Sequence, residues 1–433
     1  MVRLSQGGTV YTHCRESYGH QRSRFPHMSR RLKTWLFVVL AVLTAFLAWR
    51  FIRPMNIFLV SDAFEKPVDT STIPDPLQTL SARECGACHV EFYREWRTTI
   101  HSQAWTDPYF QSDWEFDGSQ QICRNCHTPL DRQQPQVILG FRDKDKWDPI
   151  LEPNPGFDPA LQQEGVTCAA CHLREGKIVG VLGDTDAPHP VKVLDDPNQV
   201  CVRCHVVEGD RWDTFFRFPP CGTVAEIEAT GQSTGNTGEV VVKNAADLGC
   251  VSCHMPAVER PLVAGGVTRA VRQHLWRGGH HPEMVKQGLK VELTEAAASE
   301  PGGRLFQLTL TNVGAAHYLP TGTPDRHLLV ELRLLDGLGK NIRLEKHKLE
   351  RMVMWRPFII DLWDTRLQRW QPRNFTIEIP ATGKTEAAVL EAVVWYYLVG
   401  ENRRKRIGYE NREPTAYPVF KQRVVLRGAG DNE

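Results

Sequence analysis

The chain has 433 residues, 41% of them hydrophobic, and its 52 Lys and Arg nearly balance 51 Asp and Glu. A chain this hydrophobic folds rather than staying disordered, and a net charge of +1 excludes a basic nucleic-acid binder. The length allows two or three domains of about 150 residues each.

The N-terminal part predicts a single transmembrane helix behind a basic segment. Residues 1–33 contain seven Lys and Arg but one acid, Glu16. From Trp35 to Trp49 the chain has no charge, and Phe51 and Ile52 extend the apolar stretch past Arg50. By the positive-inside rule, residues 1–33 stay in the cytoplasm, residues 34–53 form the anchor, and the rest is exported. We therefore expect a single-pass protein of the bacterial inner membrane whose other domains are periplasmic.

A cleaved signal peptide is the alternative, because an apolar run of 15 residues is also at the upper limit for a signal sequence. The bulky Phe46 and Leu47 stand before Ala48, however, so no small-x-small cleavage site follows the run. An uncleaved anchor is the favoured interpretation. Met28 opens a second possible start of translation, which an intact mass including residues 1–27 would dismiss.

The signature C-x-x-C-H occurs five times and uses ten of the 12 cysteines. Chance spacing would give roughly 0.01 such strings in this composition, so the repetition is a functional signal. Residues 54–80 are interpreted as a linker, because the polar stretch Ser61–Thr79 contains three prolines, and the signatures lie in a predicted domain over residues 81–287. The signatures consist of Cys85, Cys88 and His89; Cys123, Cys126 and His127; Cys168, Cys171 and His172; Cys201, Cys204 and His205; and Cys250, Cys253 and His254.

The spacing matches the chemistry of covalent haem attachment. Two cysteines three residues apart lie on one side of a helical turn, where both sulfurs can bond the vinyl groups on one haem edge. The histidine that follows then points at the iron as the proximal ligand. Zinc sites and disulfides are the alternatives, but zinc knuckles occur in pairs and do not require a histidine after the second cysteine. Cys14 and Cys221 stand outside the pattern, on opposite sides of the predicted membrane, and are expected to be lone thiols.

Five signatures predict five covalently attached haem c groups packed close together. The stretch from Cys85 to His254 has 170 residues, or 34 for each signature, which is too little protein to enclose each ring separately. The haems must therefore form the core of this domain, which we expect to be mostly α-helical and irregular. Ala82–Trp105 is the clearest helical segment.

After Gly288 the hydrophobic pattern changes from helix to strand. Alternating residues at 289–293, 306–310, 330–334 and 375–379, with turns at Asp336-Gly337 and Thr382-Gly383, predict a β-sandwich-like domain over residues 288–433. Segments 387–399 and 419–426 supply further strands. The basic run 403–406 between them is interpreted as a solvated hairpin loop rather than a docking patch.

The first signature carries a family resemblance. The segment Cys85–Ala104, with Tyr93, Trp96 and His101 after the C-x-x-C-H motif, resembles the periplasmic multihaem c-type cytochromes related to the nitrifier tetrahaem cytochrome that accepts electrons from hydroxylamine oxidoreductase. The resemblance implies that His101 is an axial ligand of a neighbouring haem. The loop Asn312–Gly322 looks like one in β-domains appended to such cytochromes. This chain has five signatures rather than four, which leaves the family's haem pairing open.

Eight histidines outside the signatures are candidates for the distal side of the irons. If Ala82–Trp105 is one helix, His89 and His101 are about 18 Å apart along its axis and cannot bind one iron. His101 would then serve another haem. The candidate distal ligands are His101, His189, His274, His280 and His317, whereas His281, His327 and His347 are expected not to bind iron and Met284 is a softer alternative.

The leading functional hypothesis is an electron relay, without catalysis of its own, between a quinol-linked membrane donor or other redox protein and periplasmic partners. Haem-attachment machinery would be a partner during maturation. The second hypothesis is a reductase or oxidase of a small nitrogen or sulfur compound with one five-coordinate haem. No C-x-x-C-K variant occurs, so the familiar signature of pentahaem nitrite reductases is absent from the sequence. In a third reading, compatible with both, the β-domain serves assembly or partner binding.

Overall fold

The structure is a computed structural model, and it describes residues 29–52, 60, 62, 64–183, 186–205, 214–215, 221–231, 249–380, 387–411 and 413–426. The chain separates into two compact units, residues 1–53 and 54–433. The predictions for residues 1–28, including Cys14 and the start at Met28, and for the turn at Thr382-Gly383 lie outside the described residues.

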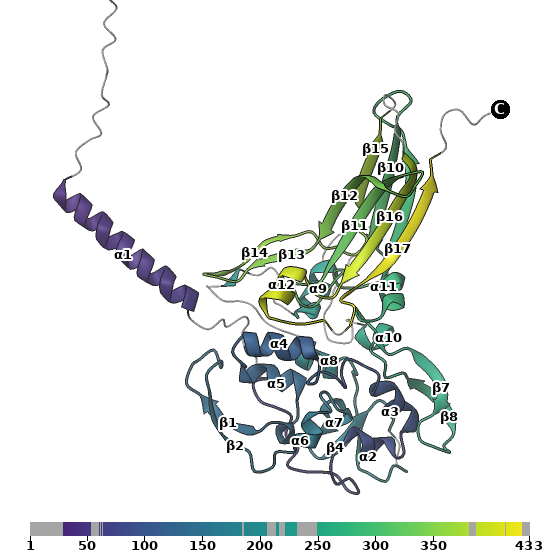
Figure 1. The fold of residues 1–433 in the computed structure, drawn as a ribbon. Coiled ribbons are helices and arrows are strands. Elements are labelled where there is room, and N and C mark those ends of the chain that lie inside the picture. Colours follow the sequence, from purple (N-terminus) through teal and green to yellow (C-terminus); the bar gives the residue numbers. More distant parts are fainter. Residues whose placement is uncertain are drawn as a thin grey trace, which may run out of the picture. The chain divides into compact units, whose positions relative to one another are not determined.

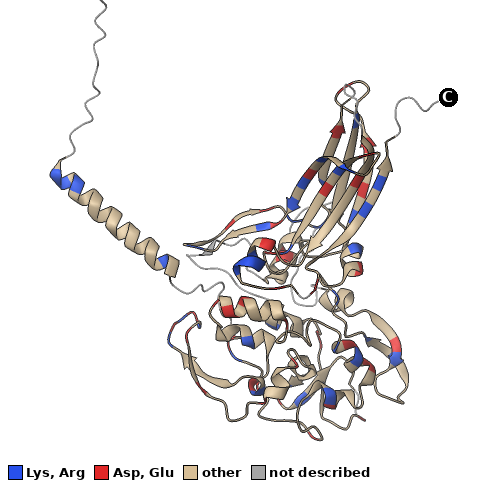
Figure 2. Ribbon diagram, in the orientation of Figure 1, with Lys and Arg blue, Asp and Glu red and all other residues tan. Residues whose placement is uncertain are grey.

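The first unit contains the helix α1 (Arg30–Ile52), which covers the predicted anchor (Figure 1). Its 23 residues span about 35 Å, and it is long and apolar enough to cross a bilayer by length and composition. Basic residues occupy its first turn and a long uncharged stretch follows (Figure 2). This is the charge pattern from which the orientation was predicted.

Short helices carry the signature region. Four of them, α5, α7, α8 and α10, end on the histidine of a signature. The helices are α2 (Ala82–Gly86), α3 (Val90–Trp96), α4 (Pro108–Phe116), α5 (Gln121–His127), η1 (Asp131–Gln133), α6 (Pro159–Gln162), α7 (Cys168–His172), α8 (Gln199–His205), α9 (Thr223–Gly231), α10 (Cys250–His254) and α11 (Pro282–Gly288).

The single helix predicted over Ala82–Trp105 is wrong. The chain leaves helical geometry at His89, where φ is −92° and ψ is 56°, and starts again as α3. His89 turns its Nδ1 to the carbonyl of Leu262, 3.0 Å away. The second helix ends at Trp96, whose indole donates to the carbonyl of Val166 at 2.8 Å. Apolar residues continue at helical spacing through both breaks, so the sequence pattern did not reveal them.

Small sheets interrupt the signature region, which is therefore less helical than expected. An antiparallel hairpin follows the second signature, a three-stranded sheet follows the third, and another hairpin follows the fifth. These strands are β1 (Gln136–Phe141), β2 (Pro149–Pro153), β3 (Leu173–Arg174), β4 (Lys177–Gly180), β5 (Val191–Val193), β7 (Ala257–Pro261) and β8 (Thr268–Arg272).

The described part of the predicted linker packs onto the signature region. Phe64 is buried against Ile122 and Trp147, beside the cysteines of the second signature. The Thr70 amide donates to the Asp131 carboxylate at 3.0 Å. This segment is thus an integral part of the second unit, because its apolar residues are placed to contact the same core as the signatures.

Two antiparallel sheets share one hydrophobic core after Gly288, as the alternating pattern predicted. The order is β15-β10-β9 in one sheet and β12-β11-β16-β17 in the other (Figure 1). Leu308 of the first sheet and Leu332 of the second are fully buried in that core. The strands are β9 (Leu289–Ala296), β10 (Arg304–Asn312), β11 (His327–Asp336), β12 (Asn341–Leu349), β15 (Arg373–Ile379), β16 (Ala387–Tyr397) and β17 (Ala416–Val425).

Three features join the β-region to the signature region. The hairpin β13 (Arg351–Met354) and β14 (Ile359–Asp364) pairs in parallel with β6 (Thr214–Phe215). The basic run is not a hairpin loop but the helix α12 (Glu401–Arg406). Its Arg403 donates to Asp113 of α4, with Nε 2.9 Å from the carboxylate. The third feature is the loop after β10, which carries His317 toward the fifth signature.

Candidate haem centres

Hydrogen bonds orient four of the five signature histidines in the same way. In each, Nδ1 donates to a backbone carbonyl, which leaves Nε2 without its proton and available to a metal. The pairs are His89 with Leu262 at 3.0 Å, His127 with Ala104 at 2.7 Å, His172 with Val179 at 2.7 Å and His254 with Arg277 at 2.7 Å. This arrangement fits a haem iron, because protein histidines that bind metals are held through the other ring nitrogen.

Burial keeps three of the signature histidines neutral. Loss of solvent lowers the pKa of His127 to about 4 and also lowers the pKa of His172 and of His205. A neutral imidazole has the free lone pair that metal binding requires. The electrostatic environment therefore agrees with the hydrogen bonding.

Four signature histidines each face a histidine from outside the signatures. The ring centroids are 6.5 Å apart for His89 and His189, 6.4 Å for His205 and His101, 5.9 Å for His172 and His274, and 6.5 Å for His254 and His317. With metal–imidazole bonds of about 2 Å, two rings on opposite sides of one iron have centroids roughly 6 Å apart. The four separations fit two axial ligands of one haem iron.

Two of the non-signature histidines are held through Nδ1 in the same way. Nδ1 of His274 donates to the carbonyl of Arg272 at 2.9 Å, and Nδ1 of His317 to that of Tyr318 at 2.8 Å. His274 is also held by its amide, which donates to Glu95 at 2.8 Å. Nδ1 of His189 is buried without a hydrogen-bond partner in the described part of the chain.

His101 lies beside His205 rather than beside His89. The structure has no single helix over Ala82–Trp105, but His101 does lie next to the histidine of another signature. Burial lowers the pKa of His101 to about 3, with the neighbouring histidines adding to the effect. Its ring is therefore neutral near pH 7.

The second signature differs from the others. Among the described residues, no histidine ring pairs with His127; instead Phe110 stacks on its face with centroids 3.5 Å apart. Trp105 and Trp114 pack next to Phe110, and Arg124 lies over the Trp114 ring at 5.2 Å. This centre is thus surrounded by aromatic residues.

The remaining candidates take other positions. His280 has no ring contact with a signature histidine within the described ranges, and the Nδ1 of His281 accepts from the Met284 amide at 3.3 Å as a helix cap. His327 stacks on Tyr397, and His347 packs against Phe375. Met284 lies near the fifth signature, in a cavity of about 250 Å³ that is also lined by Cys253 and His254.

Contacts between cysteines show which attachment sites are neighbours. Cys85 contacts Cys168, Cys126 contacts Cys204, and Cys201 contacts Cys250. The first site is therefore next to the third, and the fourth lies next to both the second and the fifth. The order in space differs from the order in the sequence.

Two aromatic residues that the sequence analysis did not select belong to these centres. Trp276 packs against both His101 and His274, and Phe92 packs between His89 and His274. Trp276 follows His274 by two residues, so its position between candidate ligands was the signal available in the sequence.

The chain is similar to known haem proteins in sequence and in fold. A protein-family model described as "Cytochrome c554 and c-prime" matches residues 84–146. The structure resembles the crystal structure of a penta-heme cytochrome c552 from Thermochromatium tepidum, with a TM-score of 0.56, 20% identity, and coverage of 80% of this chain and 98% of that one.

Other comparisons add little. The X-ray structure of Northeast Structural Genomics Consortium target SoR45 matches 34% of this chain and 92% of that chain, with 12% identity and a TM-score of only 0.17. None of the curated proteins matches the chain. The similarity of residues 84–146 to this cytochrome family, the fold shared with a penta-heme cytochrome and the repeated C-x-x-C-H signature all support a multihaem c-type cytochrome.

Proposed function

We propose that the protein is a membrane-anchored, periplasmic pentahaem cytochrome c that relays electrons between a membrane donor and periplasmic redox partners. The observation that carries this proposal is the contact between attachment cysteines of different signatures. Haems supply one-electron redox chemistry when bound, and residues that hold them side by side allow electrons to pass through the protein.

Five haems, one for each signature, follow from the five Cys-Cys-His sets. The iron ligands on the signature side are His89, His127, His172, His205 and His254. Opposite four of them stand His189, His274, His101 and His317, supported by the ring separations of 5.9 to 6.5 Å. His280 has no such support among the described residues, so it is not part of the proposed ligand set.

The membrane location rests on α1 and on the basic residues before it. An N-terminus in the cytoplasm places all five signatures on the exported side, where c-type haems are attached. A quinol-linked membrane donor or another redox protein then fits as the electron donor. Haem-attachment machinery would act on the chain during maturation.

Intact mass tests the haem count. The holoprotein should exceed its polypeptide mass by five haem groups, and replacing both cysteines of one signature by alanine should remove the mass of one haem. A holoprotein with fewer haems, or a double replacement that leaves the mass excess unchanged, would disprove the assignment of one haem to each signature.

A second candidate function, reduction or oxidation of a small nitrogen or sulfur compound, is favoured by the second signature. His127 has Phe110 against its ring and no histidine opposite it among the described residues. An iron held there with one open position could bind a substrate. The aromatic surroundings would restrict that position to a small molecule.

Electron paramagnetic resonance of the oxidised protein separates the two functions. One high-spin haem in five that binds cyanide or nitric oxide would favour the enzyme. Five low-spin haems, with the second completed by a ligand from outside the described residues, would favour the relay. Replacing both Cys123 and Cys126 by alanine should remove the high-spin signal if that signal comes from the haem of the second signature.

A further inference from the structure

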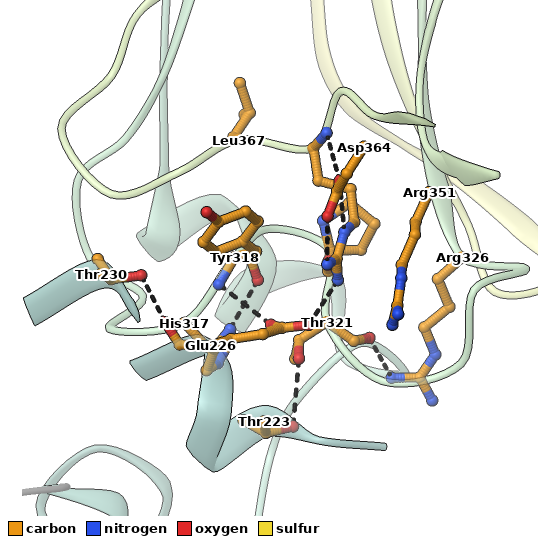
Figure 3. Close-up of polar contacts among 12 residues, drawn as sticks. Thr223, Glu226, Thr230, His317, Tyr318, Thr321, Arg326, Arg351, Asp364 and Leu367 are labelled. Atoms are coloured by element: carbon orange, nitrogen blue, oxygen red, sulfur yellow. Dashed lines mark hydrogen bonds and ion pairs between the residues drawn. The ribbon is translucent and has the colours of Figure 1, made fainter. Parts of the chain in front are cut away.

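A buried ion pair contacts the loop that carries His317. Glu226 on α9 and Arg366 after β14 lie 2.6 Å apart, and their side chains are 1% and 3% exposed. Arg366 also donates to Asp364 through Nε at 2.9 Å and Nη2 at 2.7 Å. Figure 3 shows Glu226 beside Tyr318 and His317, with Asp364 nearby.

Helix α9 lies between the signature region and this loop. Its Val224 and Ile227 form a small buried cluster with Val202 and Cys250, from the helices of the fourth and fifth signatures, and with Ala316 of the loop. Glu226 is on the same helix. A carboxylate fixed on α9 therefore has a defined position relative to both the fifth signature and the residue before His317.

The ion pair holds the loop on both sides of Leu319. The second oxygen of Glu226 accepts from the Tyr318 amide at 3.2 Å, and Arg366 Nη1 donates to the Pro320 carbonyl at 3.2 Å. The guanidinium also lies over the Tyr318 ring, 5.2 Å from its centroid. Two backbone groups next to His317 thus depend on one pair of charges.

The orientation of the His317 ring depends on the same backbone. Its Nδ1 donates to the carbonyl of Tyr318 at 2.8 Å, and its centroid lies 6.5 Å from that of His254. A shift of Tyr318 would turn the His317 ring and move Nε2 away from the line to His254. Asn312 holds the preceding part of the loop by donating to the His317 carbonyl at 2.9 Å.

Stability alone does not account for this arrangement. A buried ion pair can often be replaced by apolar residues of similar volume without loss of stability, because removing two charges from water is costly. What apolar residues could not supply is a fixed acceptor for the Tyr318 amide and a fixed donor for the Pro320 carbonyl.

We propose that Glu226 and Arg366 are positioning residues for His317, which they hold in place as the second axial ligand of the haem iron bound by His254. This inference rests on the proposed function, since it takes His254 and His317 as ligands of one iron. The β-region would then supply the second iron ligand of the fifth haem centre. The fifth haem centre would then depend on the contact between α9 and the loop that carries His317.

The experiment compares oxidised full-length holoproteins by electron paramagnetic resonance. His317→Ala should convert one haem from low to high spin, and added imidazole should reverse the change. Glu226→Gln should make the same haem high-spin in a fraction of the molecules, because the glutamine side chain no longer binds both Arg366 and the backbone amide of Tyr318. The triple replacement Glu226→Gln, Arg366→Gln and Asp364→Asn should do the same and leaves none of these three buried charges without its partner, in case the single variant does not fold.

Glu391→Gln is the matched control. Glu391 is also a buried carboxylate, 4% exposed and paired with Arg423 at 2.6 Å, but it lies on β16 and not behind the loop. It should lower the melting temperature without changing any spin state. Should His317→Ala leave all haems low-spin, the ligand assignment in the proposed function fails. Should His317→Ala act while both Glu226 variants retain the native spectrum, or should Glu391→Gln give the same high-spin signal, the positioning role fails and the ligand assignment stands.

Discussion

The indole ring of Trp276 packs edge-to-face against the ring of His101, with centroids 4.9 Å apart. The same indole packs in the same way against His274 at 5.1 Å. Trp276 has a φ of 39°, in the left-handed region that bulky side chains rarely adopt. Such strain persists only where the surroundings enforce it, and it is common at functional sites. One tryptophan thus touches the candidate distal ligands of two haems.

Replacing Trp276 by alanine should disturb both ligands at once. Edge-to-face contacts contribute about 0.5–1.5 kcal/mol each, so both rings gain freedom to turn. We expect the low-spin signals of two haems to shift or broaden in electron paramagnetic resonance, with a lower melting temperature.

Trp370 supplies the control for this substitution. It also has a left-handed backbone, with a φ of 62°, but its ring contact is with Arg369. Trp370→Ala should leave the haem signals unchanged. Equal spectral changes in the two variants would mean that Trp276 has no specific effect on His101 and His274.

Gly165 should not tolerate alanine. Its φ is +60°, and an added Cβ would lie 2.8 Å from the His101 carbonyl oxygen and 3.0 Å from the Ala104 amide. The backbone of His101 is also bonded here, because the Val166 amide donates to its carbonyl at 2.9 Å. We expect Gly165→Ala to cost more than about 2 kcal/mol in free energy of unfolding, from strain and overlap together, and to alter the low-spin signal of the haem with His101.

Gly339 is the control, because an alanine there would strain the backbone without overlapping a neighbouring atom. Its φ is +81°, but nothing lies within 4 Å of the position of an added Cβ. Gly339→Ala should therefore cost only about 1 kcal/mol in chemical unfolding and leave the spectrum unchanged. If the two alanine variants lose equal stability, the close approach to His101 has no energetic consequence.

The strands of the β-region could be predicted because one face of each is buried. Leu308 and Leu310 alternate with polar residues in β10, and both are fully buried. The hairpin β13–β14 was not predicted, since it pairs with residues far away in the sequence rather than with a buried face of its own. The break at His89 was missed because its cause, the Leu262 carbonyl, comes from a distant hairpin.

The same difference between local and distant contacts decides which residues of the candidate haem centres could be predicted. Attachment cysteines and signature histidines are local in sequence, so spacing alone revealed them. The opposite histidines are not local: His189 faces His89 across a long stretch of chain, and sequence could only name candidates. The sequence offered no sign of Phe110 beside His127, because stacking of two rings leaves no fixed spacing.

Asp113 should make stability depend on pH. Burial, the largest cause, and the nearby Asp117 and Asp325 raise its pKa to about 6, against the opposing effect of Arg403. A carboxyl group with a raised folded pKa contributes stability that is fully present below about pH 4 and is lost as the pH rises through about 6.

Asp113→Asn removes this titration. The difference in free energy of unfolding between the wild type and this variant should shift against the wild type by up to about 3 kcal/mol from pH 4 to pH 7. The shift is an upper bound because Asp113 keeps 29% of its side chain exposed. Urea unfolding at both pH values measures it. Asp148→Asn, which removes an exposed ion pair with Arg142, is the control and should change the free energy of unfolding by less than about 0.5 kcal/mol. If the difference between the wild type and Asp113→Asn does not depend on pH, the raised pKa of Asp113 is contradicted.

Fractionation tests the proposal that α1 is a membrane anchor. An uncleaved α1 should keep the haem-containing protein in the membrane pellet through high-salt and alkaline washes, with release only by detergent, because a buried apolar helix is not held by charge. A variant in which a cleavable signal peptide replaces residues 1–53 should be soluble in the periplasm with the same haem content, since residues 54–433 form a compact unit of their own.

Charge reversal before α1 provides the control for orientation. Replacing Arg30, Arg31 and Lys33 by glutamate should lower the yield of haem-containing protein, because the positive-inside signal is weakened and haem is attached only on the exported side. The mature protein in the soluble fraction, with a mass that lacks α1, would instead identify this helix as a cleaved signal. The relay would then act as a soluble periplasmic carrier, and a membrane donor would have to bind it by docking rather than by sharing its anchor.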